Sequence, residues 1–462
     1  MPVTELRCVR QVTRFAAFAS CLVLTCAAST GAQPLPRVEG PLTMEQAVEL
    51  ARGKSLRVKA SDADSRTMDS MRREALAPFW PQASANGYFN NQRMAPNVYT
   101  SAGNTMARNY QVFNADQTRD GNMTLMYSVF SGGRDYYGYK AAAARADAAR
   151  HMLKGTELDV AMQARLDYIA VLRESENERV TGELRRDVEE RLRLGREMFE
   201  AGRTPRYYLL RDEAELANAV QMDATAHSRV EIALVALKTT MGVDLSSPIT
   251  PADKLEFTPV ALSIDEGIRQ ASDTHPDLKA AVKQREAGAA EVRAAYGNYF
   301  PQVSVGYMYD WAWMKNRSWE SQAEGLRSTG NNSEGYSVGV VVTLPIFDGF
   351  ARENALKTAK AKLDKAVQSE GLVRQQIAKE VNQAVLLLTA AEKSVEASRK
   401  GLEQSEEEFR IVKERFWAGR GIQLEILDAQ VSLTRAGFNA VAALADYNSA
   451  LAMWLKATGR VR

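Results

Sequence analysis

The sequence predicts a protein of mixed class, in which amphipathic strands of a membrane β-barrel alternate with coiled-coil helices of unusual length. Three observations support this prediction: an internal repeat of about 220 residues, a seven-residue apolar periodicity, and strand segments with one apolar face. The composition is ordinary, with 45% apolar and 25% charged residues among 462. It argues against a disordered chain, a collagen-like chain and a polytopic helical membrane protein.

The N-terminal segment has the features of a secretory signal peptide. A basic start precedes an apolar run over residues 15–28, which is too short to span a bilayer, and small residues end at Ala32. We therefore expect a signal peptide over 1–32 and an exported mature protein. All three cysteines lie in this segment, so the mature protein needs no disulfide or thiol chemistry. Lipidation of Cys26 is left open, because Thr25 is a poor residue to precede a lipidated cysteine.

Charge and composition also limit the function. The chain carries 59 basic and 57 acidic residues, so no charge excess points to nucleic acid. Three scattered histidines do not make a histidine-rich metal site, and we expect neither a metal nor another cofactor. The segment 335–339 matches the nucleophile-elbow pattern of serine hydrolases. However, its serine lies within an alternating strand and no histidine follows His275, so we expect no enzyme.

Two copies of one unit make up the mature sequence. The matches lie 220 residues apart early in the copies and 217 apart later. Matches at nearly one spacing indicate a tandem duplication. We assign the first repeat to 33–261 and the second to 262–462. The matched motifs are Pro81-Gln82 with Pro301-Gln302, Phe130-Ser131-Gly132 with Phe347-Asp348-Gly349, and Phe199-Glu200-Ala201-Gly202-Arg203 with Phe416-Trp417-Ala418-Gly419-Arg420.

Each repeat is predicted to contain one very long helix, over about 133–200 and about 350–417. No proline interrupts 97–204 or 346–462. A left-handed coiled coil is indicated by consecutive heptads in the second repeat. Each helix would be about 100 Å long, which no compact domain of this size accommodates. The heptad positions are Val381, Leu388, Val395, Leu402, Phe409 and Phe416.

Shorter helices accompany the long ones. We expect half-length helices over about 42–78 and 206–242, which would match the long helix when stacked end to end. A final helix is expected over about 422–458, after the second Ala-Gly-Arg turn.

Four strands of a period-two pattern lie between the helices, at about 83–94, 121–130, 303–314 and 335–347. Aromatic residues at alternate positions of the third strand are expected to be lipid-facing or interfacial anchors. A soluble hairpin is the alternative, disfavoured by the signal peptide and the absence of another core partner. The polar segments 95–120 and 315–334 would form outer loops. The anchors are Tyr307, Tyr309, Trp311 and Trp313.

Strand counting predicts an oligomer. Four strands cannot close a barrel, because small barrels need about eight. An open four-stranded sheet would leave two edges unsatisfied in lipid, which is not tolerated. Each protomer must therefore contribute a share of one barrel.

Taken together, these motifs resemble the TolC-type outer-membrane channel family over essentially the whole mature chain. The Pro-Gln joints, the strand-to-helix turns, and Ala418-Gly419-Arg420 followed by Leu427-Asp428-Ala429-Gln430 carry the resemblance. It implies a homotrimer with a twelve-stranded outer-membrane barrel, four strands per protomer, continued by a periplasmic tunnel of coiled-coil helices. Such a duct would conduct passively between an inner-membrane RND or ABC transporter, a periplasmic adaptor and the outside.

The resemblance leaves the cargo open. Small-molecule efflux is the favoured hypothesis, because this function is commoner in the family. The alternative is the outer-membrane component of a type I protein secretion system. A secreted coiled-coil adhesin or scaffold is a remote rival, since it would not explain four duplicated amphipathic strands.

The resemblance also implies a periplasmic gate. Glu425 and Asp428, three apart on one helix face, fall at two acidic positions that line the closed entrance in the family. Six carboxylates in a trimer would favour cations. The arginine that helps to close this entrance in the family aligns here with Gly421. The repeat offset places Tyr208 and Arg211 opposite the two acids, and we hypothesise that Arg211 pairs with one of them.

The two Ala-Gly-Arg turns, at 201–203 and 418–420, are expected to join helices at the tip of the tunnel. In the family such turns meet the helical hairpin of the adaptor. The residues concerned are Ala201, Gly202, Arg203, Ala418, Gly419 and Arg420.

Overall fold

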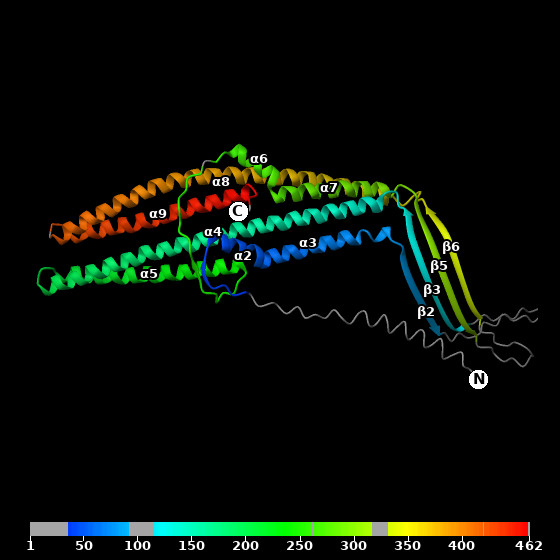
Figure 1. Cartoon of the computed structure of the whole chain (residues 1–462), viewed down its shortest axis with the longest axis horizontal. Helices are drawn as coiled ribbons and strands as arrows, with labels where there is room; N and C mark the ends of the chain where they lie inside the picture. Colours follow the sequence, from blue (N-terminus) through cyan, green and yellow to red (C-terminus); the bar gives the residue numbers. More distant parts are fainter. Residues whose placement is uncertain (1–35, 92–114, 261, 317–330, 419, 461–462) are drawn as a thin grey trace, which may run out of the picture.

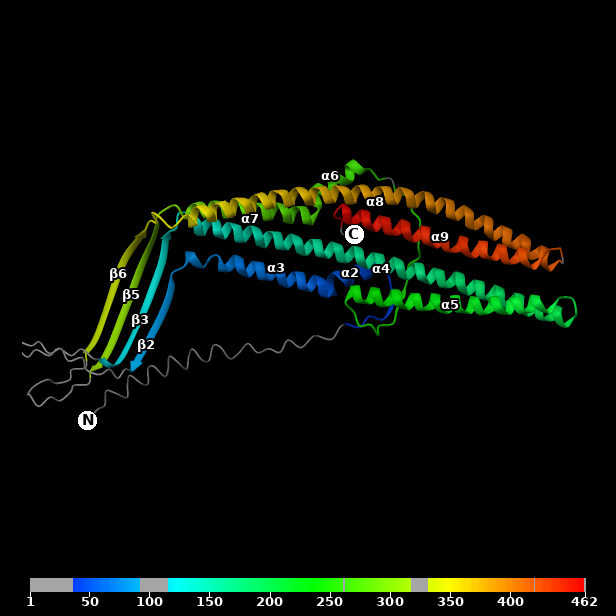
Figure 2. The same cartoon turned by 180° about the vertical axis from the view of Figure 1, so that it is seen from behind.

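The computed structural model describes residues 36–91, 115–260, 262–316, 331–418 and 420–460. The predicted signal peptide, Cys26 and Gly419 lie outside the described residues. A four-stranded sheet lies at one end of a long helical body, and two helical hairpin turns lie at the other end (Figure 1). The view from behind shows the same succession (Figure 2).

The first repeat contains a long helix, α4, that returns through the shorter helix α5. Its elements are β1 (Gly40–Leu42), α2 (Met44–Lys54), α3 (Leu56–Glu74), the 3₁₀ helix η1 (Ala77–Phe79), β2 (Gln82–Asn91), β3 (Ala115–Phe130), α4 (Arg134–Glu200) and α5 (Arg206–Met241).

The strand β4 (Ile249–Pro251) ends the first repeat and pairs with β1. The second repeat then contains α6 (Ile264–Thr274), α7 (Pro276–Gly297), β5 (Gln302–Asn316), β6 (Asn331–Thr343), α8 (Ala351–Trp417) and α9 (Gln423–Ala457), in the order of the corresponding helices and strands of the first repeat. Both α4 and α8 have 67 residues, which corresponds to about 100 Å.

The four-stranded sheet is antiparallel throughout, with the strand order β2-β3-β5-β6. Its strands extend into both predicted outer loops, because β3 begins at Ala115 and β6 at Asn331. At the other end β6 stops at Thr343 rather than at 347, since Pro345 has no N–H to donate to a ladder. The strands β2 and β6 are the two edges of the sheet.

One face of the sheet is apolar and the other is polar. Across β3 and β5, Met123 faces Tyr309 and Leu125 faces Tyr307. On the opposite face Asn86 donates a side-chain hydrogen bond of 2.9 Å to Asn122. The alternation therefore separates a surface suited to lipid from one suited to water.

The half-length helices meet end to end at a joint that both repeats share. In the first repeat the helix predicted over 42–78 is broken at Ser55, where Gly242 at the end of α5 packs against it. Gly242 has φ +67°, and an added Cβ would lie 2.8 Å from the Lys54 carbonyl oxygen. In the second repeat Gly459, with φ +70°, abuts His275 in the same way. Only glycine combines that backbone conformation with so close an approach.

An extended strap connects the two repeats and is held by two buried tyrosines. The Tyr168 hydroxyl donates to the Leu42 carbonyl at 2.7 Å and accepts from the Asp253 N–H at 3.3 Å. Further along, the Tyr447 hydroxyl donates to the Thr258 carbonyl, and its ring packs edge-on against Phe257. The strap thereby fastens one helical hairpin to the other at mid-length.

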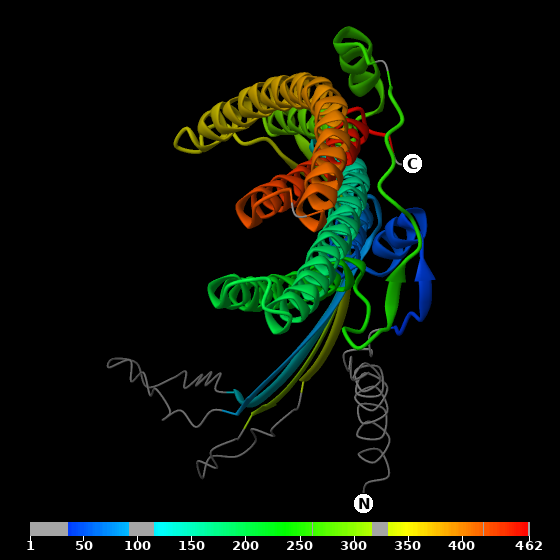
Figure 3. The ribbon, with the colours of Figure 1, turned by 90° about the vertical axis from the view of Figure 1, so that its left-hand side faces the viewer.

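Seen along the long axis, the helices form an open arc (Figure 3). In the half next to the sheet the helices follow the order α3-α4-α7-α8, and in the other half the order is α5-α4-α9-α8. Among the described helices, none is both long and apolar enough to span a bilayer.

His275 gives the second joint a pH dependence. Its buried ring caps α7, because Nδ1 accepts from the Asp277 N–H at 3.3 Å. Burial lowers the pKa of His275, although the nearby carboxylates of Asp277, Glu380 and Asp159 oppose this and Lys456 adds to it. Protonating Nδ1 would remove the acceptor of the cap.

The folded protein should therefore lose stability as pH falls below about 6.5, the ordinary histidine value, because the unfolded chain then binds more protons. His275→Asn keeps a capping acceptor without titrating, so its apparent melting temperature should fall less between pH 7 and 5. His275→Ala removes the cap, at a cost of about 1 kcal/mol. Circular dichroism at 222 nm measures all three proteins. If the melting temperatures of wild type and His275→Asn fell equally between pH 7 and 5, His275 would not be the source of the pH dependence.

Candidate functional site

The two hairpin turns lie together at the end of the molecule opposite the sheet (Figure 1). In the first turn Gly202 has φ +67°, and the Arg203 N–H donates to the Met198 carbonyl at 2.8 Å. The second turn repeats this bond, with the Arg420 N–H donating to the Arg415 carbonyl at 2.9 Å. These bonds cap both long helices.

The described turn residues are accessible from outside. Exposed residues are Ala201, Gly202, Arg203, Ala418 and Arg420, and the sixth predicted contact, Gly419, is not described. A partner could reach these turns without rearranging the helices, and the predicted adaptor contact stays a prediction.

A cleft of about 440 Å³ separates the two hairpins just behind the turns. Its lining combines apolar and aromatic side chains from both repeats with the polar side chains of Arg191, Asp212 and Gln423. The first hairpin contributes Met198, Tyr208 and Leu209, and the second contributes Phe416, Trp417 and Ile422.

A buried polar network bridges the hairpins beside this cleft. Arg191 on α4 pairs with Asp212 on α5, with 3.0 Å between Nε and Oδ1, and their side chains are only 4% and 6% exposed. From α9, Gln423 donates to the same Asp212 oxygen at 3.0 Å and to the Tyr208 carbonyl at 3.3 Å. Arg191 also donates through Nη1 to Gln430 of α9. Three helices therefore share one ion pair.

The network is not fully satisfied. Among the described residues, three of its buried polar atoms have no hydrogen-bond partner: Arg191 Nη2, Gln423 Oε1 and Gln430 Nε2. Unpartnered polar groups in a low-dielectric site lower the stability of the arrangement that buries them. The contact between the hairpins is thus specific, but some of its buried polar atoms lack hydrogen bonds.

The predicted gate residues lie on α5 and α9, two of the three helices that contribute to this network. Glu425 is half-buried, and its Oε2 lies 3.9 Å from Arg415 Nη2 on α8. An added Cβ at Gly421 would lie 3.3 Å from the same Glu425 oxygen. Asp428 is exposed, and Tyr208 stacks on Tyr207 with 4.2 Å between ring centroids.

Within one protomer the structure does not bring Arg211 to either acid. Arg211 is exposed, and the described residues include no ion pair between it and Glu425 or Asp428. The cation found beside Glu425 is Arg415. The pairing of Arg211 with Glu425 or Asp428 across neighbouring helices stays a hypothesis.

Sequence reasoning missed Arg191 and Asp212, although one signal was available. Arg191 follows Val188 by three residues and precedes Leu192, and both of these neighbours are buried. A charge on the apolar stripe of a coiled coil requires a buried partner. Comparing the two repeats could not identify this pair, because such a comparison finds residues that both repeats share, and the pair occurs only in the first repeat.

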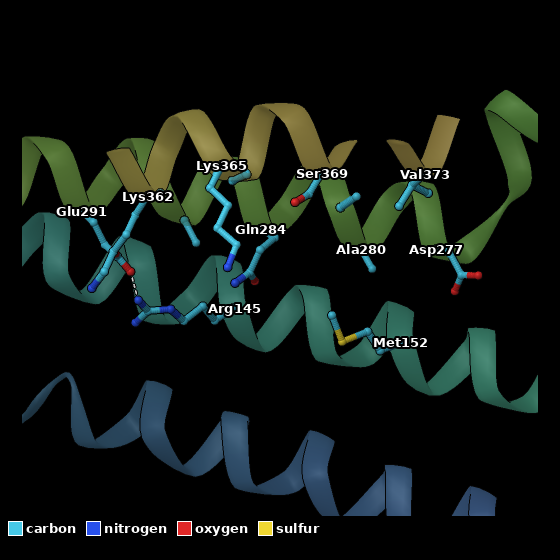
Figure 4. Close-up of a pocket in the computed structure, with 14 residues that line it drawn as sticks. Arg145, Met152, Asp277, Ala280, Gln284, Glu291, Lys362, Lys365, Ser369 and Val373 are labelled. Atoms are coloured by element: carbon cyan, nitrogen blue, oxygen red, sulfur yellow. Dashed lines mark ion pairs between the residues drawn. The ribbon is translucent and has the colours of Figure 1, made fainter. Parts of the chain in front are cut away.

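A second groove, of about 640 Å³, lies between α4, α7 and α8 (Figure 4). Alanines, glycine and long charged side chains line it, and an ion pair between Arg145 and Glu291 joins α4 to α7. Gly288 lets α7 approach α8, since its added Cβ would lie 3.4 Å from the Leu363 Cα. These are features of helix packing. The better candidate site is the tip, the end of the molecule that carries the two hairpin turns and the cleft behind them.

Comparisons with known proteins identify the architecture. The family model described as outer membrane efflux protein matches residues 267–460. The CmeC outer membrane channel of Campylobacter jejuni has a similar fold, with a TM-score of 0.76 at 17% identity over 90% of this chain and 85% of that one. The match shows that residues 267–460 have the sequence pattern of the outer membrane efflux protein family. This finding confirms the resemblance to TolC-type channels and places the protein in the outer membrane, with a helical periplasmic portion.

Family relatives match along most of the chain. Protein CyaE of Bordetella pertussis is 26% identical over 72% of this chain and 70% of its own length. Outer membrane efflux protein BepC of Brucella suis is 24% identical over 78% of this chain and 75% of its own length. Members of this family are channels rather than enzymes.

Loss of one charge from the buried network at the tip should lower the stability of the folded protein sharply. Asp212→Leu leaves the Arg191 guanidinium buried without its counter-ion, which costs about 3–5 kcal/mol. Arg191→Met/Asp212→Leu removes both charges and should recover most of the loss. Thermal unfolding followed at 222 nm in detergent compares the two.

Arg193→Met is the matched control. Arg193 lies on the same helix and pairs only with exposed glutamates, so its replacement should leave the melting temperature nearly unchanged. If Asp212→Leu has the same melting temperature as Arg193→Met, the buried ion pair does not stabilise the fold.

Proposed function

We propose that three copies of this protein form the exit duct of a tripartite export system. Twelve strands would close one outer-membrane barrel, and the helical arcs would close a periplasmic tunnel. Substrate would pass passively from an inner-membrane transporter and its periplasmic adaptor to the outside.

The observation that carries the proposal is the pair of free sheet edges. Within the part of the chain that the structure describes, β2 and β6 have a neighbouring strand on one side only, whereas a sheet in lipid must satisfy every backbone N–H and C=O. Pairing β6 of one copy with β2 of the next satisfies both edges and closes the barrel without a further element.

The helical body supports the same assembly. Its two free edges carry exposed apolar side chains, which water disfavours and a neighbouring copy would cover. Exposed residues on one edge are Leu56 of α3 and Val220, Ile232 and Val235 of α5, and on the other edge Leu372, Leu386 and Leu387 of α8.

The tip would serve as the gate of this duct. The Arg191–Asp212 pair and its two glutamines would hold the α8–α9 hairpin against the α4–α5 hairpin in the closed state. Glu425 and Asp428 from three copies would place six carboxylates around the aperture, and such a ring attracts cations. The exposed turns would receive the adaptor.

Small molecules are the proposed cargo. The name of the relative BepC describes an efflux protein, and the matching family model describes efflux as well. The family also supplies the outer-membrane component of type I protein secretion systems, so an experiment on cargo is needed.

The acidic aperture should make the channel cation-selective. In planar bilayers we expect small cation-selective currents from wild type, and a loss of selectivity in Glu425→Ala/Asp428→Ala. The control Asp64→Ala/Glu74→Ala removes as many carboxylates from α3, far from the tip, and should keep the selectivity. A double variant that conducts like wild type would refute the acidic gate but retain the duct. A folded trimer without any current would refute the duct.

The cargo can be tested by deleting the gene. Small-molecule efflux predicts that the deletion strain becomes more sensitive to toxic compounds, that its secreted proteome is unchanged, and that the wild-type gene restores resistance. Dose–response curves and mass spectrometry of culture supernatants measure the two effects. Loss of a secreted protein at unchanged drug sensitivity would favour type I secretion.

A further inference from the structure

One arginine lies within the apolar face of the membrane sheet. Arg119 of β3 is paired in register with Phe89 of β2 and with Trp313 of β5. Its guanidinium carbon lies 5.5 Å from the centroid of the Phe89 ring and 4.8 Å from that of Trp313. The side chain is exposed, and among the described residues no carboxylate lies within 4.0 Å of it.

The nearby acidic side chains are directed elsewhere. Asp120 is adjacent in the strand and so projects from the opposite face. Glu334 of β6 accepts a hydrogen bond of 2.9 Å from the Tyr309 hydroxyl. The protein surface around Arg119 therefore presents a cation to its surroundings without neutralising it.

The position of Arg119 along the strand fixes its depth in the membrane. It lies ten residues from Val129, which is next to the helical end of β3. Ten residues at about 3.4 Å, tilted by about 40°, rise by about 26 Å along the membrane normal. The apolar band of such barrels is about 25 Å tall. In the barrel proposed above, with the apolar band beginning at Val129, Arg119 would reach the level of the outer-leaflet headgroups.

The neighbouring aromatic rings hold the guanidinium in place. Phe89 and Trp313 flank it, and Trp311 packs over Gly121, where an added Cβ would lie 2.5 Å from the indole. A guanidinium fixed in this way loses less conformational entropy when it binds a ligand. It also presents a planar set of donors that fits a phosphate.

We infer that Arg119 binds the phosphate of an anionic outer-leaflet lipid, with Phe89 and Trp313 as positioning residues. The inference rests on the barrel proposed above, because that assembly turns the apolar face towards lipid. One barrel would carry three such sites, spaced around its outer rim. They would fix the height of the barrel in the membrane.

The test is retention of lipid A by the purified trimer, measured by native mass spectrometry after exchange into mild detergent. Bis-phosphorylated lipid A is compared with the same lipid stripped of phosphate. Wild type should retain the phosphorylated form, and Arg119→Gln should bind it about tenfold or more weakly, as expected for loss of a charge-assisted hydrogen bond. Arg119→Lys should be intermediate, since it keeps the charge but not the paired donors.

Arg293→Gln is the matched control, because Arg293 also lies over an aromatic ring, 5.6 Å from the centroid of Tyr137, but in the helical body. It should bind lipid like wild type. Trp313→Leu keeps the cation and loosens it, so it should weaken retention even if Arg119→Gln assembles poorly.

Equal retention by wild type and Arg119→Gln, or equal retention of both lipid forms by wild type, would overturn the inference. Competition by millimolar inorganic phosphate would reassign the site to a small anion. The trimer band on an unheated gel reports the barrel separately: its absence in wild type refutes the proposed assembly, and its presence without phosphate-dependent retention refutes only the lipid site.

Discussion

The organisation of this protein depends on the backbone hydrogen bonds at the two edges of a four-stranded sheet. In lipid an unpaired N–H or C=O costs several kcal/mol, so the free sides of β2 and β6 are not stable in a single chain. The same two edges continue into the helical body as α3 and α5 on one side and α8 on the other. A copy that pairs its strands with a neighbour thereby also covers the exposed apolar faces of these helices.

The tandem repeat contains the same architecture twice. The two copies differ at the contact between their hairpins. The glycine joints at Ser55 and His275 are equivalent, and so are the hydrogen bonds that cap α4 and α8. The buried network is not duplicated. Positions equivalent to Arg191, Asp212, Gln423 and Gln430 are occupied by Glu408, Ala429, Arg206 and Glu213. The two hairpins thus share a fold but differ in the residues at their contact.

Much of the fold could be predicted, because its determinants are local and periodic. The proline-free heptads predict helices like α4 and α8, and alternation predicts strands. The predictions that were wrong concern features that depend on residues distant in the sequence. The break at Ser55 is caused by Gly242, which is remote in sequence, and β3 extends through polar residues because its partner β5 is long. Arg191 and Asp212 were missed because most charges on a coiled coil are solvated, and only the packing of three helices buries these two.

The position of the network relative to the turns explains how a remote contact could open the tip. Arg191 precedes Gly202 by eleven residues, so about 16 Å of continuous helix joins them. A partner bound at the exposed turns would shift this rigid segment and act on a polar cluster that already contains unpartnered atoms. Water admitted by the shift would hydrate those atoms, which offsets part of the cost of separating the ion pair. In the gate proposed above, these unpartnered polar atoms would lower the binding energy that a partner needs to open the tip.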